Sequence, residues 1–269
     1  MRINPDVDAG THPYISTGLQ NNKFGIPWAE ARAAYRAASA LPGIEIIGLD
    51  CHIGSQIADA APVVEALDRL LRLVDDLEED GISIHHLDVG GGLGITYEDE
   101  TPPTPASYAE ALRQRLEGRP LRVVLEPGRV ILGNAGVMLT RVELVKRNGE
   151  KRFVVVDAAM NDLIRPTLYS AYHRIVTVGD PSQTTEVVDI VGPICESGDF
   201  LAQGRELPTV KATDLLAVRS AGAYGFAMTS NYNSRPRPPE VLVDGASYDI
   251  IRSRETLDDL WRGERIPKS

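Results

Sequence analysis

Apolar and polar positions in residues 1–134 follow the rhythm of a parallel α/β fold. Short apolar runs bounded by turn residues predict buried strands, and the segments between them carry apolar residues at three- and four-residue steps, which predicts amphipathic helices. The predicted strands are residues 1–3, 44–52, 84–89 and 121–126, and the predicted helices are residues 27–41, 62–80 and 105–118. Because helices of this length connect parallel strands, we expect a series of βα units.

From about residue 135 the pattern changes to that of a β domain. Short strand-like runs follow one another, and Asn148-Gly149 is a hairpin turn signal between the first two. The predicted strands are residues 137–146, 152–157, 186–191, 215–219 and 240–243. The sequence therefore predicts a partial α/β barrel over residues 1–134 and an all-β domain over residues 135–269.

Composition narrows the functional classes. The 269 residues include 28 basic and 38 acidic side chains, and the net charge of −10 argues against non-specific nucleic-acid binding. No apolar run approaches the roughly 18 residues of a membrane span, and the N-terminus has no signal-peptide core. Two cysteines form neither a disulfide framework nor a zinc cluster, and no metal site is predicted. We expect a cytoplasmic enzyme or small-molecule binder.

Three predicted strands each end in a segment that contains polar side chains and glycines. The Gly90-Gly91-Gly92 run is compatible with a phosphate cradle or with a plain tight turn. His52, followed by Ser55, could stack on a flat ring, act as acid or base, or be structural. The Glu126-Pro127-Gly128-Arg129 turn is either part of a site or a surface salt bridge.

The β domain carries a fourth motif at residues 192–199, Gly-Pro-Ile-Cys-Glu-Ser-Gly-Asp. A lone cysteine is usually a small buried hydrophobe. Cys195 beside Glu196, in a loop between glycines, is a better candidate for proton transfer. A further glycine-flanked segment contains Tyr224.

Taken together, these segments resemble the diaminopimelate decarboxylases, group IV decarboxylases that use pyridoxal phosphate and have the alanine-racemase-like fold. The resemblance covers essentially the whole chain. It is carried by NPDVDAGTHPYISTGLQNNKFGI, GLDCHIGSQ, LDVGGGLGI, LEPGR, DAAMNDLIRPTLY, GPICESGDFLA, GAYGFAMTSNYNSRPRP and SYDIIRSRETLDDL. The fold it implies is the C-terminal half of a pyridoxal-phosphate-binding (β/α)8 TIM-type barrel, followed by an all-β domain of modified Greek-key type.

The resemblance also implies roles for individual residues. Cofactor contacts are implied for His52, Ser55, Gly91, Gly92, Glu126, Gly128, Arg129 and Tyr224, with His52 stacked on the pyridine ring and Glu126 facing its nitrogen. Substrate contacts are implied for Arg129, Arg165, Tyr169, Glu196 and Tyr224, and Cys195 is implied as the proton donor. In the family the Cys-Glu loop comes from the partner subunit, which implies a homodimer with shared active sites.

The implied reaction is the decarboxylation of meso-2,6-diaminopimelate to L-lysine, the last step of lysine biosynthesis. One feature departs from the family, whose Schiff-base lysine lies in a Lys-Ala-Asn-like segment of the first barrel strand. No such segment surrounds the lysines of this chain, which are Lys23, Lys146, Lys151, Lys211 and Lys268. We therefore expect a truncated chain whose Met1 falls at the fifth of eight strands. The alternatives are a decarboxylase of ornithine or arginine, or a non-catalytic truncated product.

Overall fold

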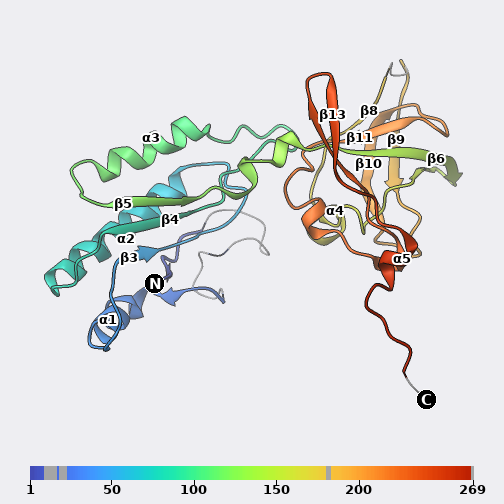
Figure 1. Cartoon of the computed structure of the whole chain (residues 1–269). Helices are drawn as coiled ribbons and strands as arrows, with labels where there is room; N and C mark the ends of the chain where they lie inside the picture. Colours follow the sequence, from blue (N-terminus) through green and yellow to red (C-terminus); the bar gives the residue numbers. More distant parts are fainter. Residues whose placement is uncertain (9–16, 18–22, 180–182, 268–269) are drawn as a thin grey trace. The chain divides into compact units, whose positions relative to one another are not determined.

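The computed structural model describes residues 1–8, 17, 23–179 and 183–267. Much of the family-like segment at residues 4–26 therefore lies outside the described residues, as does Lys268. The chain forms two units, Met1–Gly133 and Asn134–Ser269 (Figure 1). Each unit has its own apolar core.

The first unit is built on a parallel sheet. Its strands β3 (Gly48–Asp50), β4 (His86–Gly91) and β5 (Arg122–Glu126) pair in the order β3-β4-β5. Two short strands, β1 (Ile3–Asn4) and β2 (Ile26–Pro27), pair in parallel, and Arg2 bridges to Asp50 of β3. The parallel strands predicted here are confirmed, and their carboxyl ends meet at one edge of the sheet.

The strand predicted over residues 44–52 is longer than the one observed. Ile44 and Ile47 are 54% and 49% exposed and precede β3. The apolar run thus includes a connecting segment that contributes little to the core, and periodicity alone does not separate the two.

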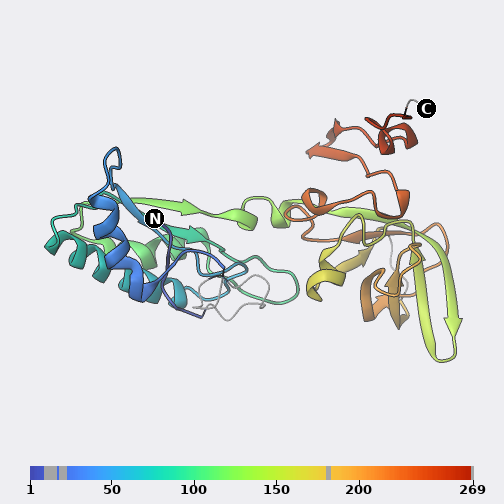
Figure 2. The same cartoon turned by 90° about the horizontal axis from the view of Figure 1, so that it is seen from below.

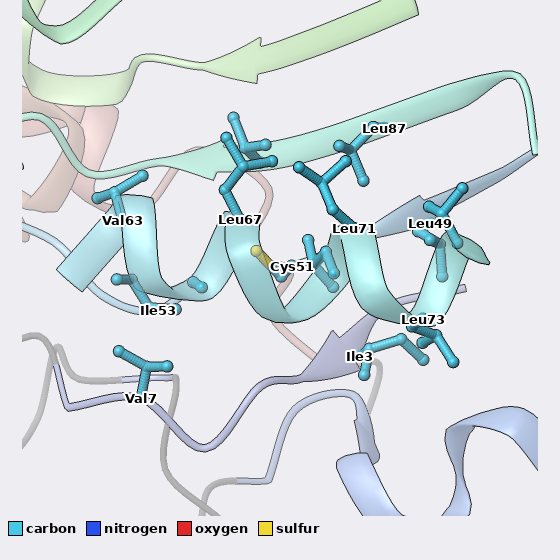
Figure 3. Packing of buried hydrophobic residues seen from close by; sticks show 14 of the residues in the cluster. Ile3, Val7, Leu49, Cys51, Ile53, Val63, Leu67, Leu71, Leu73 and Leu87 are labelled. Carbon is cyan, nitrogen blue, oxygen red and sulfur yellow. The ribbon is translucent and has the colours of Figure 1, made fainter. Parts of the chain in front are cut away.

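Three helices accompany this sheet: α1 (Trp28–Ser39), α2 (Ala61–Glu79) and α3 (Pro105–Leu116). The apolar residues that recur at three- and four-residue steps in the predicted helix 62–80 are all buried in α2, namely Val63, Leu67, Leu70, Val74 and Leu77. Figure 3 shows Leu67 and Leu71 of α2 close to Leu87 of β4. Pro62 lies in the first turn of α2, where its missing N–H has no intrahelical partner to lose.

Helices α1 and α2 lie next to each other (Figure 2) and share a carboxylate at the end of α2. Asp80 Oδ2 accepts hydrogen bonds from Arg32 Nε at 2.7 Å and from Arg36 Nε at 2.6 Å. These two guanidinium groups hold the pKa of Asp80 below its ordinary value. A lowered folded-state pKa stabilises the fold above the ordinary carboxyl pKa, and this stability is lost as the pH falls.

The substitution Asp80→Asn is therefore expected to reduce the free energy of unfolding near neutral pH and to have a smaller effect in acid. Urea unfolding at several pH values measures this difference. The control is Asp99→Asn, because Asp99 is exposed and has no described ion pair. An Asp80→Asn effect that does not change with pH would contradict the charged pairing.

The second unit contains a six-stranded sheet in the order β10-β9-β7-β6-β11-β8. Its strands are β6 (Met138–Asn148), β7 (Lys151–Val156), β8 (Ile175–Thr177), β9 (Thr185–Val191), β10 (Phe200–Pro208) and β11 (Leu215–Val218). The predicted hairpin is confirmed, because β6 and β7 are antiparallel and Gly149 turns between them with a φ of +59°. A separate hairpin consists of β12 (Glu240–Asp244) and β13 (Ser247–Arg252).

The prediction of an all-β second half missed several elements. It missed the strands β8, β10 and β13 and the short helices α4 (Arg165–Tyr169) and α5 (Leu257–Leu260). The register of β10 shifts twice, between Phe200 and Ala202 and between Ala202 and Arg205, so its apolar residues do not alternate. Every residue of β13 is exposed, which leaves no buried face to detect. Among the described residues, no helix is both long and apolar enough to span a membrane.

Candidate functional site

Three carboxylates meet where the parallel strands end. Asp50 of β3, Asp88 of β4 and Glu126 of β5 have oxygen atoms that lie within 4.8 Å of one another. The register explains this, because Asp50 pairs with Asp88 and Glu126 pairs with Gly91. Burial, followed by the charge of Asp88, raises the pKa of Asp50, while Arg2 acts in the opposite direction. This group, the carboxylate trio, favours a cationic partner.

His52 lies beside this trio with a half-buried imidazole. Its Nδ1 accepts a hydrogen bond from the backbone N–H of Gly91 at 3.1 Å, which assigns the ring proton to Nε2. Burial and then the charge of Arg2 lower the pKa of His52, although Glu126 and Asp88 oppose the shift. The site therefore presents a flat, neutral ring.

The glycines after β4 allow close backbone packing. A Cβ atom on Gly91 would lie 1.5 Å from the carbonyl oxygen of Glu126, and one on Gly92 would lie 2.0 Å from that of Gly54. Gly90 and Gly92 also have positive φ angles of +72° and +91°. The structure gives these glycines a packing role, and a contact of Gly91 and Gly92 with phosphate stays a prediction.

Arg129 lies in a 3₁₀ turn (Gly128–Val130) directly after β5, and its side chain is buried. Its Nη2 donates to Ser55 Oγ at 2.6 Å, and its Nη1 donates to the hydroxyl of Tyr97 at 2.8 Å. Two predicted site residues, Ser55 and Arg129, are thus in direct contact. Sequence reasoning missed Tyr97, and an isolated tyrosine gives no signal of this kind.

In the second unit, the loop at residues 192–199 is organised by a buried carboxylate. Asp199 Oδ1 accepts the N–H of Met160 and its Oδ2 accepts the N–H of Ile194, both at 2.7 Å. Burial raises the pKa of Asp199. Thr167 of α4 donates to the carbonyl of Gly198 at 2.5 Å, so the loop is fixed to α4. No role had been predicted for Asp199, although it closes the motif.

Cys195 and Glu196 are exposed at the tip of this loop. The hydroxyl of Tyr232 donates to Glu196 Oε2 at 2.6 Å, and this hydrogen bond, followed by the charge of Glu196, raises the pKa of Tyr232. Glu196 and Tyr232 line a pocket of about 440 Å³ together with Met160, Asn161, Ile164 and Ser230. The pocket is lined by apolar side chains and by one carboxylate, that of Glu196.

The remaining predicted residues of this unit differ in exposure. Arg165, which begins α4, is buried, and its Nη1 lies 2.8 Å from His173 Nε2. Tyr169 ends the same helix four residues later and is half-buried, so the two side chains share a helix face. Tyr224 is 40% exposed and has a φ of +57°. The predicted site residues therefore form one group in Met1–Gly133 and another in Asn134–Ser269.

Comparison with protein families gives a match for the first unit, which contains the first group of predicted site residues. Residues 1–133 match the family described as "Pyridoxal-dependent decarboxylase, pyridoxal binding domain". The chain is 56% identical over 266 residues to a diaminopimelate decarboxylase of Pseudomonas fluorescens, and 54% identical over 267 residues to that of Vibrio cholerae. Each match covers 99% of this chain and 64% of the relative, so the chain spans about two thirds of these relatives' length.

Solved structures show the same fold. The chain superposes on diaminopimelate decarboxylase from Helicobacter pylori, complexed with L-lysine, with a TM-score of 0.91 at 42% identity. That match covers 97% of this chain and 65% of the other. A lysine decarboxylase from Selenomonas ruminantium gives a TM-score of 0.76 at 26% identity, over 87% of this chain and 60% of the other. The predicted fold, half of a barrel followed by a β domain, is confirmed by these neighbours.

Proposed function

We propose, since the chain belongs to the diaminopimelate decarboxylase family, that it binds pyridoxal phosphate and serves the decarboxylation of meso-2,6-diaminopimelate to L-lysine. The observation that carries the proposal is the position of neutral His52 beside the carboxylate trio at one sheet edge. A flat uncharged ring and a negative group are what a protonated pyridine ring requires on its face and at its nitrogen.

The chemistry of the residues present fits this cofactor. Glu126, backed by Asp50 and Asp88, would hold the protonated pyridine nitrogen, and His52 would lie against the ring. The Ser55 hydroxyl and the Arg129 guanidinium, already in contact, are suited to a phosphate group. When bound, pyridoxal phosphate supplies an electron-poor ring that accepts the electron pair left by departing CO₂.

In this proposal the second group of residues recognises the substrate and moves a proton. Arg165 and Tyr169 bind a carboxylate of the substrate, and Glu196 accepts a hydrogen bond from its distal ammonium group. Cys195 delivers a proton to the carbon that has lost CO₂, and Tyr224 contacts cofactor and substrate. A substrate with two carboxylates agrees with the Arg165–Tyr169 pair better than ornithine or arginine does.

We further propose a homodimer in which the Cys195–Glu196 loop enters the partner's active site, and a cytoplasmic location. Support for the first comes from the loop itself, because Asp199 holds it rigidly while its tip stays exposed. Support for the second comes from the biosynthetic relatives.

The experiment is a titration of the chain with pyridoxal phosphate, followed by absorbance. No lysine lies between Lys23 and Lys146, so we expect non-covalent binding that sodium borohydride does not make permanent. Glu126→Gln should weaken binding by about tenfold or more, because a hydrogen bond to a charged group is worth roughly 1.5–3 kcal/mol. The matched control is Glu117→Gln, at an exposed position after α3.

Equal affinity of the Glu126→Gln variant and the wild type would contradict the assigned position of the ring nitrogen. Absence of any binding to the wild-type chain would favour the non-catalytic alternative. A borohydride-stable adduct on Lys23 would contradict the expectation of non-covalent binding.

A further inference from the structure

A buried histidine, His173, contacts Arg165, which is one of the residues proposed to bind the substrate carboxylate. His173 lies between α4 and β8, and its relative exposure is 0%. Its Nε2 is 2.8 Å from Arg165 Nη1, and its Nδ1 is 2.9 Å from the carbonyl oxygen of Arg219. The imidazole therefore links the first residue of α4 to the segment that follows β11.

The two contacts define the state of the imidazole. A guanidinium group only donates hydrogen bonds, so Nε2 must accept from Arg165. A carbonyl oxygen only accepts, so Nδ1 must carry the proton that binds Arg219. The ring is thus neutral and has its single proton on Nδ1. A second proton would occupy Nε2 and remove the lone pair that Arg165 uses.

We propose that His173 is a positioning residue, which fixes the guanidinium of Arg165 for the carboxylate of the substrate. This inference rests on the proposed function, in which Arg165 binds that carboxylate. A neutral acceptor suits the task, because it orients the guanidinium without adding a negative charge that would compete with the substrate.

The surroundings of His173 hold its backbone in place. Arg205 of β10 donates from Nη1 to the carbonyl oxygen of His173 at 2.8 Å, and its guanidinium stacks on the ring of Tyr172 at 3.8 Å. Two cationic side chains, Arg165 and Arg205, therefore approach this residue from α4 and β10.

The first test reads the wild-type chain and uses a variant only to assign the signal. In the chain labelled with ¹⁵N-histidine, the ¹⁵N spectrum at neutral pH should show His173 as the neutral tautomer with its proton on Nδ1. Assignment comes from the signal lost in His173→Gln. An Nε2–H tautomer, or an imidazolium at neutral pH, would overturn the inference whatever the chain binds.

The second test uses a matched pair of variants. The amide of His173→Gln reaches the place of Nε2 and can accept from Arg165, whereas His173→Asn is shorter and reaches only the place of Nδ1. We expect slowly rotating, separate Nη signals for Arg165 in the wild type and in His173→Gln, and averaged signals in His173→Asn. Averaged signals in the wild type, or separate signals in His173→Asn, would contradict the positioning role.

Calorimetry with meso-2,6-diaminopimelate, in the presence of pyridoxal phosphate, separates the two proposals. The affinity should fall by about tenfold in His173→Asn, the loss of one hydrogen bond to a charged group, and by less than about threefold in His173→Gln. Equal losses in both variants would make His173 a packing residue only. If the wild type binds no diaminopimelate, the proposed function fails for this chain, while the tautomer and the Arg165 signals still decide whether His173 fixes the guanidinium.

Discussion

Alanine in place of Gly91 is expected to destabilise the Met1–Gly133 unit by about 3 kcal/mol or more. The added Cβ would lie 1.5 Å from the carbonyl oxygen of Glu126 and 2.4 Å from its carbonyl carbon. Both atoms belong to backbone that pairs with Gly91 in the sheet, so neither can move without breaking the end of β5. Urea unfolding, followed by circular dichroism, measures the loss.

Gly118→Ala is the matched control for Gly91→Ala. Gly118 also lies in the first unit and has a positive φ of +77°, but nothing lies within 4 Å of the position its Cβ would take. Its substitution therefore adds only backbone strain, about 1–2 kcal/mol. If Gly91→Ala costs no more than Gly118→Ala, the close approach between β4 and β5 is not the reason for the glycine.

The second large effect concerns the rate. In any preparation of the protein that decarboxylates meso-2,6-diaminopimelate, Cys195→Ala should lower kcat by about 10²–10⁴-fold, the usual contribution of a positioned acid or base. Cys195 is exposed at the tip of a loop that Asp199 holds in place, so its removal leaves no cavity. Affinity for pyridoxal phosphate should stay unchanged.

The chain contains its own control in Cys51. This thiol is 1% exposed, and burial raises its pKa to about 12, so it stays protonated and out of contact with solvent. Cys51→Ala should lower the melting temperature and leave kcat nearly unchanged. A Cys195→Ala enzyme with near-normal kcat would exclude the thiol as the proton donor.

The hydrophobic pattern alone predicted the helices and strands whose residues are buried at regular intervals. The predicted helix 62–80 corresponds closely to α2, because one continuous face of that helix is buried. Strand β10 was missed because two register shifts break its alternation, and β13 was missed because it has no buried face. Hydrophobic periodicity reflects which positions of an element are buried. It therefore cannot predict an element whose burial is irregular or absent.

The part of the site that lies at the ends of the predicted strands could be predicted from the sequence. His52, the glycine run and Glu126 each follow an apolar run, and parallel pairing brings them together. Tyr97, Asp199 and His173 were missed because each acts through one specific contact with a distant or irregular segment. No composition or spacing rule encodes such a contact, and it appears only when the chain is folded.

The open side of β5 has a consequence for how the protein behaves in a crowded solution. All five residues of this strand are exposed, including Val123, Val124 and Leu125, and β5 is the last strand of the described sheet in the first unit. An uncovered strand with apolar side chains is a template on which another polypeptide can add. Association of this protein should therefore rise with its concentration, because every added chain brings further segments that can pair with the open edge of β5.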